Sequence, residues 1–281
     1  MGATSAAIFI VLGNERGGVG KTTLAANLGV AIARSGITAA LLELDGRQRS
    51  LARWLERRVA TARRNSESLT IPAHEVLVPA RFDSISLNEE RDFAMLSAAV
   101  ERLDRIADVI VADTASGDSY LTRLAHSLAD IVLTPVEDSF AARDLLAGGY
   151  GRTIAEARRS RDGMGDGRVD WIVVENRRGA VPGRADGAIG MPLAALAREH
   201  GFRTAPGLRE QLVHRALFAE GRAVCDATPH EGLRLPLSAT DARVAARQEV
   251  EALVFALYLP FAPTGISPTR RRMARASDPV G

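Results

Sequence analysis

A single lysine stands beside 35 arginines in this chain, and it lies in a glycine-rich loop. The loop is Arg16-Gly17-Gly18-Val19-Gly20-Lys21-Thr22-Thr23, and it follows residues 6–12, an apolar run as long as a buried strand. The ammonium of lysine is a compact charge on a flexible stem, so it can enter a ring of backbone N–H groups that excludes the planar guanidinium of arginine. The loop therefore predicts a phosphate-binding site, for which the alternative is a glycine turn with a surface lysine.

A helix is expected directly after this loop, because residues 22–35 carry apolar side chains at helical spacing. The first-turn N–H groups and the helix dipole would both face the phosphates. In such a site Lys21 reaches the outer phosphates and the hydroxyl of Thr22 binds Mg²⁺. The standard pattern G-x-x-x-x-G-K-[ST] fails here, since Glu15 replaces its first glycine. The variant x-[KR]-G-G-x-G-K-[ST] is present instead, with a second cation at Arg16.

The rest of the chain alternates apolar runs of strand length with helical patterns, which predicts an α/β fold with a mostly parallel sheet and helices on both faces. Strands are expected at 6–12, 39–44, 109–113, 131–136 and 171–175. Helices are expected at 22–35, 50–58, 91–107, 119–128, 140–158, 192–200, 209–220 and 240–259, with exposed loops at 161–168 and 178–190. We expect one domain over 1–260, followed by a basic tail, 261–281, whose composition predicts disorder.

Composition excludes several other classes of protein. An apolar content of 46% in 281 residues suffices for one large core. The single cysteine, Cys225, excludes a disulfide framework within the chain and fits a reducing cytoplasm. No apolar stretch is long enough to cross a bilayer, and the first apolar run has no basic lead-in of a signal peptide. We therefore expect a cytoplasmic protein.

Positive charge concentrates in two segments. Residues 47–64 contain seven arginines and one acid, and residues 177–222 contain eight arginines and four acids. Both segments are candidates for contact with nucleic acid or another anionic surface, and a solvated helix face is the alternative for each. In the second segment the candidate DNA-contacting residues are Arg178, Arg184, Arg198, Arg203, Arg209 and Arg215.

Acidic side chains occur where predicted strands end, which is where ligands bind in open α/β sheets. Asp113 ends the run 109–113 and is expected to hold Mg²⁺ through water. Gly117, just downstream, could offer its N–H to a γ-phosphate. Glu43 and Asp45 lie on the same side of a strand end, where one could orient the attacking water and the other support the Mg²⁺ shell. The alternative for Asp45 is a helix N-cap.

An amide and several imidazoles complete the candidate groups. Asn176 follows the strand 171–175 and precedes Arg177, so its amide could read the edge of adenine, with a turn residue as the alternative. The histidines show no metal-ligand spacing, and a structural role is expected for each of them. They are His74, His126, His200, His214 and His230.

The loop 14–23 resembles the deviant Walker A motif of the ParA/MinD ATPases. The segments 43–50, 113–119, 171–177, 201–209 and 245–249 resemble MipZ, the branch of that family that positions the division plane, and the resemblance spans roughly residues 7–259. It implies an ATP- and Mg²⁺-dependent switch, in which two protomers face each other across two ATP molecules and slow hydrolysis returns them to monomers.

The resemblance also implies roles for individual residues. Catalytic roles fall to Lys21, to Asp45 as the switch I acid needed for hydrolysis, and to Arg16, which would take the place of the signature lysine and reach the partner's phosphates. Asp113 matches the Walker B acid, Gly117 the switch II glycine and Asn176 the adenine-reading asparagine. The expected nucleotide-binding residues are Gly17, Gly18, Val19, Gly20, Lys21, Thr22, Thr23, Asp113, Gly117, Asn176 and Arg177, with Thr22 and Asp113 at the metal.

The partners that the resemblance implies are a second copy of the chain, nonspecific DNA, a ParB-like centromere-binding protein and FtsZ, whose polymerisation would be inhibited. The protein would then be associated with the nucleoid or the pole. Two alternatives remain. One is a ParA-like positioner of chromosomes or cargo. The other is a nucleotide-dependent binding module with little hydrolysis, which is favoured because Arg16, Glu43 and Ala115 depart from the family's motifs. No stable membrane anchor is expected, since the basic stretch 269–276 has only Met273 as a sizeable apolar residue.

Overall fold

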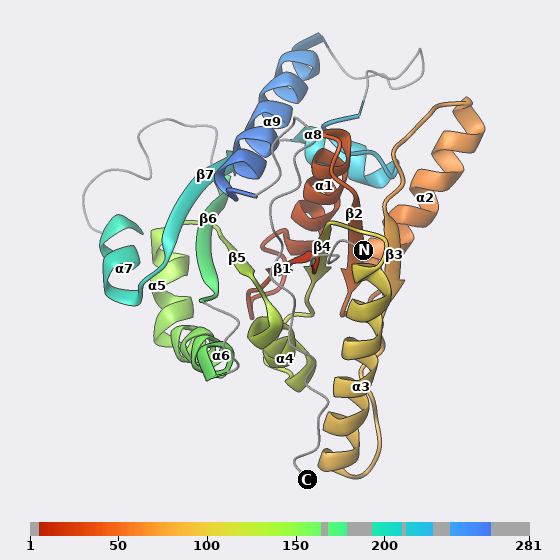
Figure 1. Cartoon of the computed structure of the whole chain (residues 1–281). Helices are drawn as coiled ribbons and strands as arrows, with labels where there is room; N and C mark the ends of the chain where they lie inside the picture. The colour runs from red at the N-terminus through yellow and green to blue at the C-terminus, as the bar shows by residue number, and fades with distance from the viewer. Residues whose placement is uncertain (1–5, 164–167, 179–192, 210–211, 227–236, 260–281) are drawn as a thin grey trace, which may run out of the picture.

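The computed structural model describes residues 6–163, 168–178, 193–209, 212–226 and 237–259, without the side chains of 177–178 and 237–240. Its centre is a seven-stranded sheet in the order β3-β2-β4-β1-β5-β6-β7, in which all paired strands are parallel (Figure 1). The strands are β1 (Ile8–Leu12), β2 (Ala39–Glu43), β3 (Ala73–Val76), β4 (Val109–Asp113), β5 (Ile131–Val136), β6 (Asp170–Arg178) and β7 (Arg203–Arg209). The α/β fold expected from the sequence is confirmed.

Helices cover both faces of the sheet, because the central strands are apolar on both sides. In β1, Ile10 and Leu12 enter one core while Phe9 and Val11 enter the other. The first core is covered by α1 (Lys21–Arg34), α2 (Ser50–Asn65), α8 (Leu212–Ala219) and α9 (Leu237–Ala256). The second is covered by α3 (Ile85–Asp104), α4 (Tyr120–Leu128), α5 (Ser139–Ala147), α6 (Tyr150–Gly163) and α7 (Leu193–His200).

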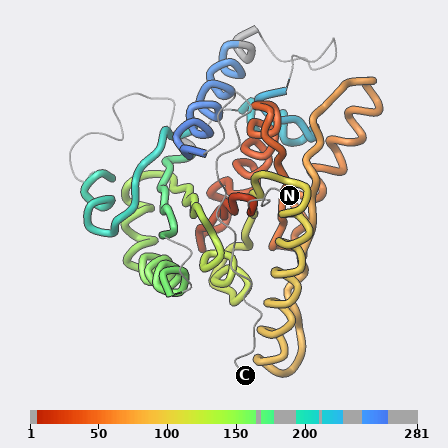
Figure 2. Tube along the Cα trace, in the orientation of Figure 1, coloured from red at the N-terminus to blue at the C-terminus, as the bar shows by residue number. Residues whose placement is uncertain are grey.

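The chain starts at the centre of the sheet and builds both edges in turn. β1 lies in the middle, β4, β2 and β3 extend to one edge, and β5, β6 and β7 extend to the other. The tube in Figure 2 follows this path from the red centre through the gold side to the green and blue side. The order reverses beside β1, and this is where ligands bind in open parallel sheets.

The two edge strands were not expected from the sequence. β3 exposes Ala73 and His74, and β7 alternates between exposed and partly buried residues and contains Pro206. An edge strand has a neighbour on one side only, so it needs no continuous apolar run and tolerates a proline. These strands therefore lack the signal by which the central five were recognised.

Three local expectations were wrong. Residues 140–158 form two helices, α5 and α6, because the chain turns at Gly149, whose φ is +106°. Arg161 lies in α6 and not in an exposed loop. Its side chain is buried, and its charge has partners there, because it donates to Leu128 O at 2.8 Å and pairs with Asp130. The loop expected at 178–190 begins one residue too early, because Arg178 still belongs to β6. The rest of that loop and the tail at 261–281 lie outside the described residues.

Candidate nucleotide-binding site

The loop between β1 and α1 needs glycine for its shape. Gly18 and Gly20 have φ of +79° and +92°, in the left-handed region that glycine favours. A Cβ on Gly20 would also lie 2.4 Å from Nδ2 of Asn176. Asn14 braces the start of the loop, since its Nδ2 donates to Pro135 O at 2.7 Å and its Oδ1 accepts from Arg16 N at 2.8 Å.

Lys21 lies inside this loop with its charge enclosed. Its Nζ donates to the carbonyls of Asn14 at 2.8 Å and Arg16 at 3.1 Å, and to Ser116 Oγ at 3.4 Å. Burial lowers the pKa of the ammonium, and the carboxylates of Asp113 and Asp45 act in the opposite direction. The lysine is therefore a buried positive charge between the loop and the acids.

Asp113 ends β4 directly beside the first turn of α1. The residue is buried, and its Oδ1 has no hydrogen-bond partner among the described atoms. Burial raises the pKa of the carboxyl to about 7, while a hydrogen bond from Thr22 and the charge of Lys21 oppose this rise. A buried carboxylate oxygen next to a threonine hydroxyl fits a hydrated Mg²⁺ ion, because this cation prefers oxygen ligands and keeps several waters.

The described residues contain no cluster of three or more histidine, cysteine or acidic side chains that could hold a metal by themselves. A cation at Asp113 would then depend on Thr22, on water and on phosphate oxygens. This donor set is the one that Mg²⁺ uses when it accompanies a nucleotide.

Several predicted residues meet around one hollow of about 280 Å³. Its walls include Lys21, Thr22, Asp45 and Asp113, from α1, the segment after β2 and the end of β4. The remaining lining residues are Gly18, Gly20, Thr23, Glu43, Gln48, Ser50, Thr114, Ser116 and Phe218. Parallel strands bring these groups together, because the carboxyl ends of β1, β2 and β4 lie at the same edge of the sheet.

Glu43 has a different environment from the one expected for a metal-shell acid. It is buried, and its two carboxylate oxygens accept from Leu51 N at 3.0 Å and Ala52 N at 2.9 Å, in the first turn of α2. Burial raises the pKa of this carboxyl, and these backbone hydrogen bonds oppose the rise. Asp45 lines the hollow, and its Oδ1 also accepts from Gln48 N at 3.2 Å.

The segment after β4 is tied to the phosphate loop. Gly117, with φ of +86°, donates its N–H to Glu15 O at 2.7 Å. Thr114 Oγ1 donates to Leu12 O at 2.7 Å, and Ser116 approaches Lys21. Ser116 was not expected at the site, because a serine three residues after the end of a strand carries no spacing signal.

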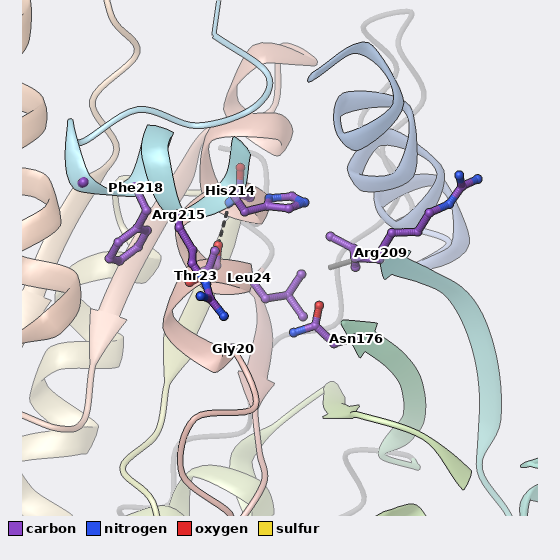
Figure 3. A pocket seen from close by; sticks show the side chains of 11 residues that line it. Gly20, Thr23, Leu24, Asn176, Arg209, His214, Arg215 and Phe218 are labelled. Atoms are coloured by element: carbon purple, nitrogen blue, oxygen red, sulfur yellow. Dashed lines mark hydrogen bonds between the residues drawn. The ribbon is translucent and has the colours of Figure 1, made fainter. Parts of the chain in front are cut away.

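A second hollow of about 240 Å³ continues from the first, with which it shares Gly20, Thr23 and Phe218 (Figure 3). Asn176 lies at its edge and donates from Nδ2 to Val19 O at 2.6 Å. The other lining residues are Leu24, Asn27, Leu208, Arg209, His214, Arg215 and Ala219. None of the α8 residues was expected at this site, since they lie on an amphipathic helix and form no motif, and Arg215 was expected to contact DNA instead.

Arg16 lies outside both hollows. It is exposed, and it lines a neighbouring groove with Glu15 and Asp144. Arg16 is therefore not among the residues that line the phosphate hollow of its own chain. Arg177 belongs to β6 by its backbone, and its side chain is outside the described parts of the molecule.

The arginines predicted to contact DNA are dispersed. Arg198 is exposed on α7, whereas Arg203 is half-buried and donates to Asp170 at 2.7–3.0 Å and to Ala256 O at 2.7 Å. Arg209 pairs with Glu249 at 3.1 Å and, with Arg215, lines the second hollow. Arg178 is described only by its backbone, and Arg184 lies outside the described residues.

The parallel sheet, the phosphate loop at its centre and the acids at its edge define a P-loop nucleotide hydrolase. Solved structures with this architecture include a variant of McdA from Cyanothece in complex with ATP, at 18% identity and a TM-score of 0.60, covering 90% of this chain and 97% of that one. MinD from Aquifex aeolicus matches at 18% identity with a TM-score of 0.58, and the match covers 95% of this chain and 100% of that one. MinD from Pyrococcus horikoshii, complexed with Mg-ADP, matches at 16% identity with a TM-score of 0.55, and the match covers 90% of this chain and 96% of that one.

The chain belongs to the family of MipZ ATPases, whose model matches residues 8–261. The resemblance to the ParA/MinD type is thereby confirmed, and the protein is an ATPase by family. A search of curated protein sequences found no significant match. Each helix within the described ranges is too short or too polar to cross a membrane.

Proposed function

We propose that this protein is an ATP-dependent dimer switch that regulates placement of the division site. It would bind Mg-ATP, pair with a second copy across the two nucleotides, and return to the monomer after slow hydrolysis. The observation that carries the proposal is the convergence of Lys21, Thr22, Asp45 and Asp113 on one hollow. The nucleotides bound to the McdA variant and to P. horikoshii MinD support its ligand part.

Each group at the hollow has a chemical role in this proposal. Lys21 neutralises the outer phosphates, and Thr22 and Asp113 hold the magnesium ion, which would supply charge neutralisation at the phosphates. Asp45 orients the attacking water. Gly117 can give its N–H to a γ-phosphate only after it leaves Glu15 O, so triphosphate binding would displace the segment after β4.

Arg16 would complete the site of the second copy. Its exposed position, away from the hollow of its own chain, supports an action in trans. A cation that reaches the partner's phosphates stabilises the charge that develops during phosphoryl transfer. Dimerisation and hydrolysis would then both depend on Arg16.

The proposed DNA surface includes the solvent face of α2 and the turn before it. Arg47, Arg53 and Arg63 are exposed there, whereas Arg58 is buried and belongs to the core. Contacts of this kind reach phosphates and need no base readout. Arg47→Ala, Arg53→Ala and Arg63→Ala together should weaken binding to any duplex sequence and lower the salt slope by about 1 per lost phosphate contact.

A second set of candidate DNA contacts, separate from the α2 surface, comprises the exposed arginines of the 177–222 segment. Arg198, Arg209 and Arg215 remain candidates, and Arg203 is left out because Asp170 and Ala256 O engage it. An Arg102→Ala variant is a suitable control, since Arg102 is exposed on α3 and pairs with Glu75. Its DNA affinity should equal that of the unmutated protein.

The proposed protein partners are those that the resemblance to MipZ implies. We propose that the dimer contacts a ParB-like protein and inhibits polymerisation of FtsZ, in the cytoplasm at the nucleoid or the pole. FtsZ assembly followed by light scattering tests this point, with ADP- and ATP-loaded protein compared at equal concentration. Unchanged FtsZ assembly together with capture of a cargo protein would favour the ParA-like positioner.

A second candidate function is a nucleotide-dependent binding module with little hydrolysis. The observation that favours it is that both acids near the end of β2 already have partners: the carboxylate of Glu43 accepts from the first turn of α2, and that of Asp45 accepts from Gln48 N. Phosphate release after a single turnover separates the two candidates. A rate equal to that of Asp45→Ala would favour the binding module.

The main experiment is light scattering of the purified chain with ADP, with ATP and with a slowly hydrolysed ATP analogue, with and without DNA. A dimer that appears only with the triphosphate supports the switch. Lys21→Ala should lose ATP binding, and Asp45→Ala should bind ATP and stay dimeric. Normal hydrolysis by Asp45→Ala would contradict its assignment, and a chain that stays monomeric with every nucleotide would contradict the switch.

A further inference from the structure

His214 is a partly buried histidine of α8 whose side chain the described residues leave without hydrogen bonds. Both of its ring nitrogens are buried, and neither has a hydrogen-bond partner among the described residues. Most buried side-chain polar atoms in proteins have such a partner, because leaving one unpaired costs the free energy of its lost hydration. The usual structural role of a core histidine therefore does not explain this one.

The imidazole lies beside the second hollow, together with Asn176 and Leu24 (Figure 3). This hollow joins the phosphate hollow through Gly20 and Thr23. A nucleotide whose phosphates lie at Lys21 would extend its base into this second space.

The position of His214 is set by the packing of α8. Val213 and Leu217 are buried in the first core, and Phe218 stacks on Trp54 of α2 with ring centroids 6.0 Å apart. The imidazole is thus presented by a helix that is packed on both sides. Rigid presentation lowers the entropy cost of forming a hydrogen bond to a ligand.

The chemistry of the two side chains complements adenine. Burial lowers the pKa of His214, so its ring is neutral and offers one donor and one acceptor. Asn176 uses Nδ2 on Val19 O, which leaves Oδ1 to accept a hydrogen bond. Adenine presents an amino donor next to a ring-nitrogen acceptor, whereas guanine presents a carbonyl oxygen in place of the amino group.

We infer that His214 is a base-binding residue, which donates its ring N–H to a ring nitrogen of adenine while Asn176 Oδ1 accepts from the 6-amino group. This inference rests on the proposed binding of ATP. It assigns to this histidine a contact with the ligand, in place of the structural role expected from the sequence.

Binding of ADP and of tripolyphosphate to the full chain tests the inference. His214→Phe keeps the volume of the ring and should weaken ADP binding about tenfold, the loss of one well-placed hydrogen bond. Tripolyphosphate, which has no base, should bind equally well to both proteins. His214→Gln should recover part of the ADP affinity. His74→Phe, which removes an exposed histidine of β3, is the matched control and should change nothing.

Base analogues identify the ring nitrogen of adenine that His214 contacts. One of 1-deaza-, 3-deaza- and 7-deaza-ADP should bind the unmutated protein about tenfold less tightly than ADP, and this difference should vanish in His214→Phe. Equal affinities of the unmutated protein for ADP and all three analogues would overturn the inference. So would a His214→Phe variant that binds ADP normally.

A third measurement needs no variant at His214. In nitrogen NMR of the unmutated protein, ADP should shift a ring nitrogen of His214, and tripolyphosphate should leave it unchanged. Absence of an ADP-induced shift would overturn the inference. Failure of the unmutated chain to bind either ADP or tripolyphosphate would instead refute the proposed nucleotide site, so the two failures are distinguishable.

Discussion

Glu43 should act as a structural tether of α2 and not as a magnesium ligand. The residue is 1% exposed, and each of its carboxylate oxygens accepts one N–H of the first turn of α2. In Glu43→Gln the side chain keeps its length but has only one acceptor oxygen. The new amino group is a donor, so one of the two N–H groups loses its partner.

The expected cost follows from these two hydrogen bonds. Losing a bond to a charged acceptor costs about 1.5–3 kcal/mol, and the bond that remains becomes a weaker neutral one. Removing a buried charge returns part of this free energy, because burial already raises the pKa of the Glu43 carboxyl. The net loss in the free energy of unfolding should be about 2–3 kcal/mol, or roughly 4–12 °C in Tm.

Urea unfolding followed by circular dichroism measures this loss. Glu56→Gln is the matched control, since Glu56 is an exposed acid on α2 that pairs with Arg49 at 3.2 Å, and its removal should change the free energy of unfolding by less than about 1 kcal/mol. The magnesium concentration needed for ATP binding should stay unchanged in Glu43→Gln and rise in Asp113→Asn. A Glu43→Gln protein of normal stability with a raised magnesium requirement would refute the tether.

Three further predictions concern the core beneath the site. Asp226→Asn should destabilise the protein by about 3–5 kcal/mol in urea unfolding, because it removes the charge that faces Arg58 at 2.7 and 2.8 Å in a fully buried pair. Gly13→Ala should cost about 1–3 kcal/mol in the same assay, since its Cβ would lie 2.2 Å from Nε2 of His126 and 2.3 Å from the hydroxyl of Tyr150. Burial lowers the pKa of His126 from 6.5 to about 4, so the unfolded chain takes up a proton at higher pH than the native one. The free energy of unfolding should then decrease as the pH falls from 6.5 to 4, by up to about 3 kcal/mol. In unfolding curves measured at pH 5–8, His126→Asn should reduce this dependence on pH, and an unchanged dependence would contradict the prediction.

The central strands and the phosphate loop could be predicted because their signals are local. Residues 9–12 and 109–113 are buried, Ile8 is partly buried, and both strands are apolar throughout, apart from the terminal Asp113. The glycines and Lys21 form one short segment, so phosphate binding could be predicted from them without knowledge of the fold. The edge strands β3 and β7 carry no such pattern, since within the described ranges each of them has a neighbouring strand on one side only.

Sequence alone determined the class of the fold and the identity of the phosphate loop, because strand, glycine turn and helix start are adjacent in the chain. Tertiary structure decided which side chains complete the site. Glu43 meets Leu51 and Ala52 through the turn that follows β2, and Asn176 meets Val19 across 157 positions. His214 reaches the same space from α8, at the far end of the sequence. Contacts of this kind depend on the order of the strands in the sheet and on the packing of helices over it. Neither can be predicted from a local pattern of residues.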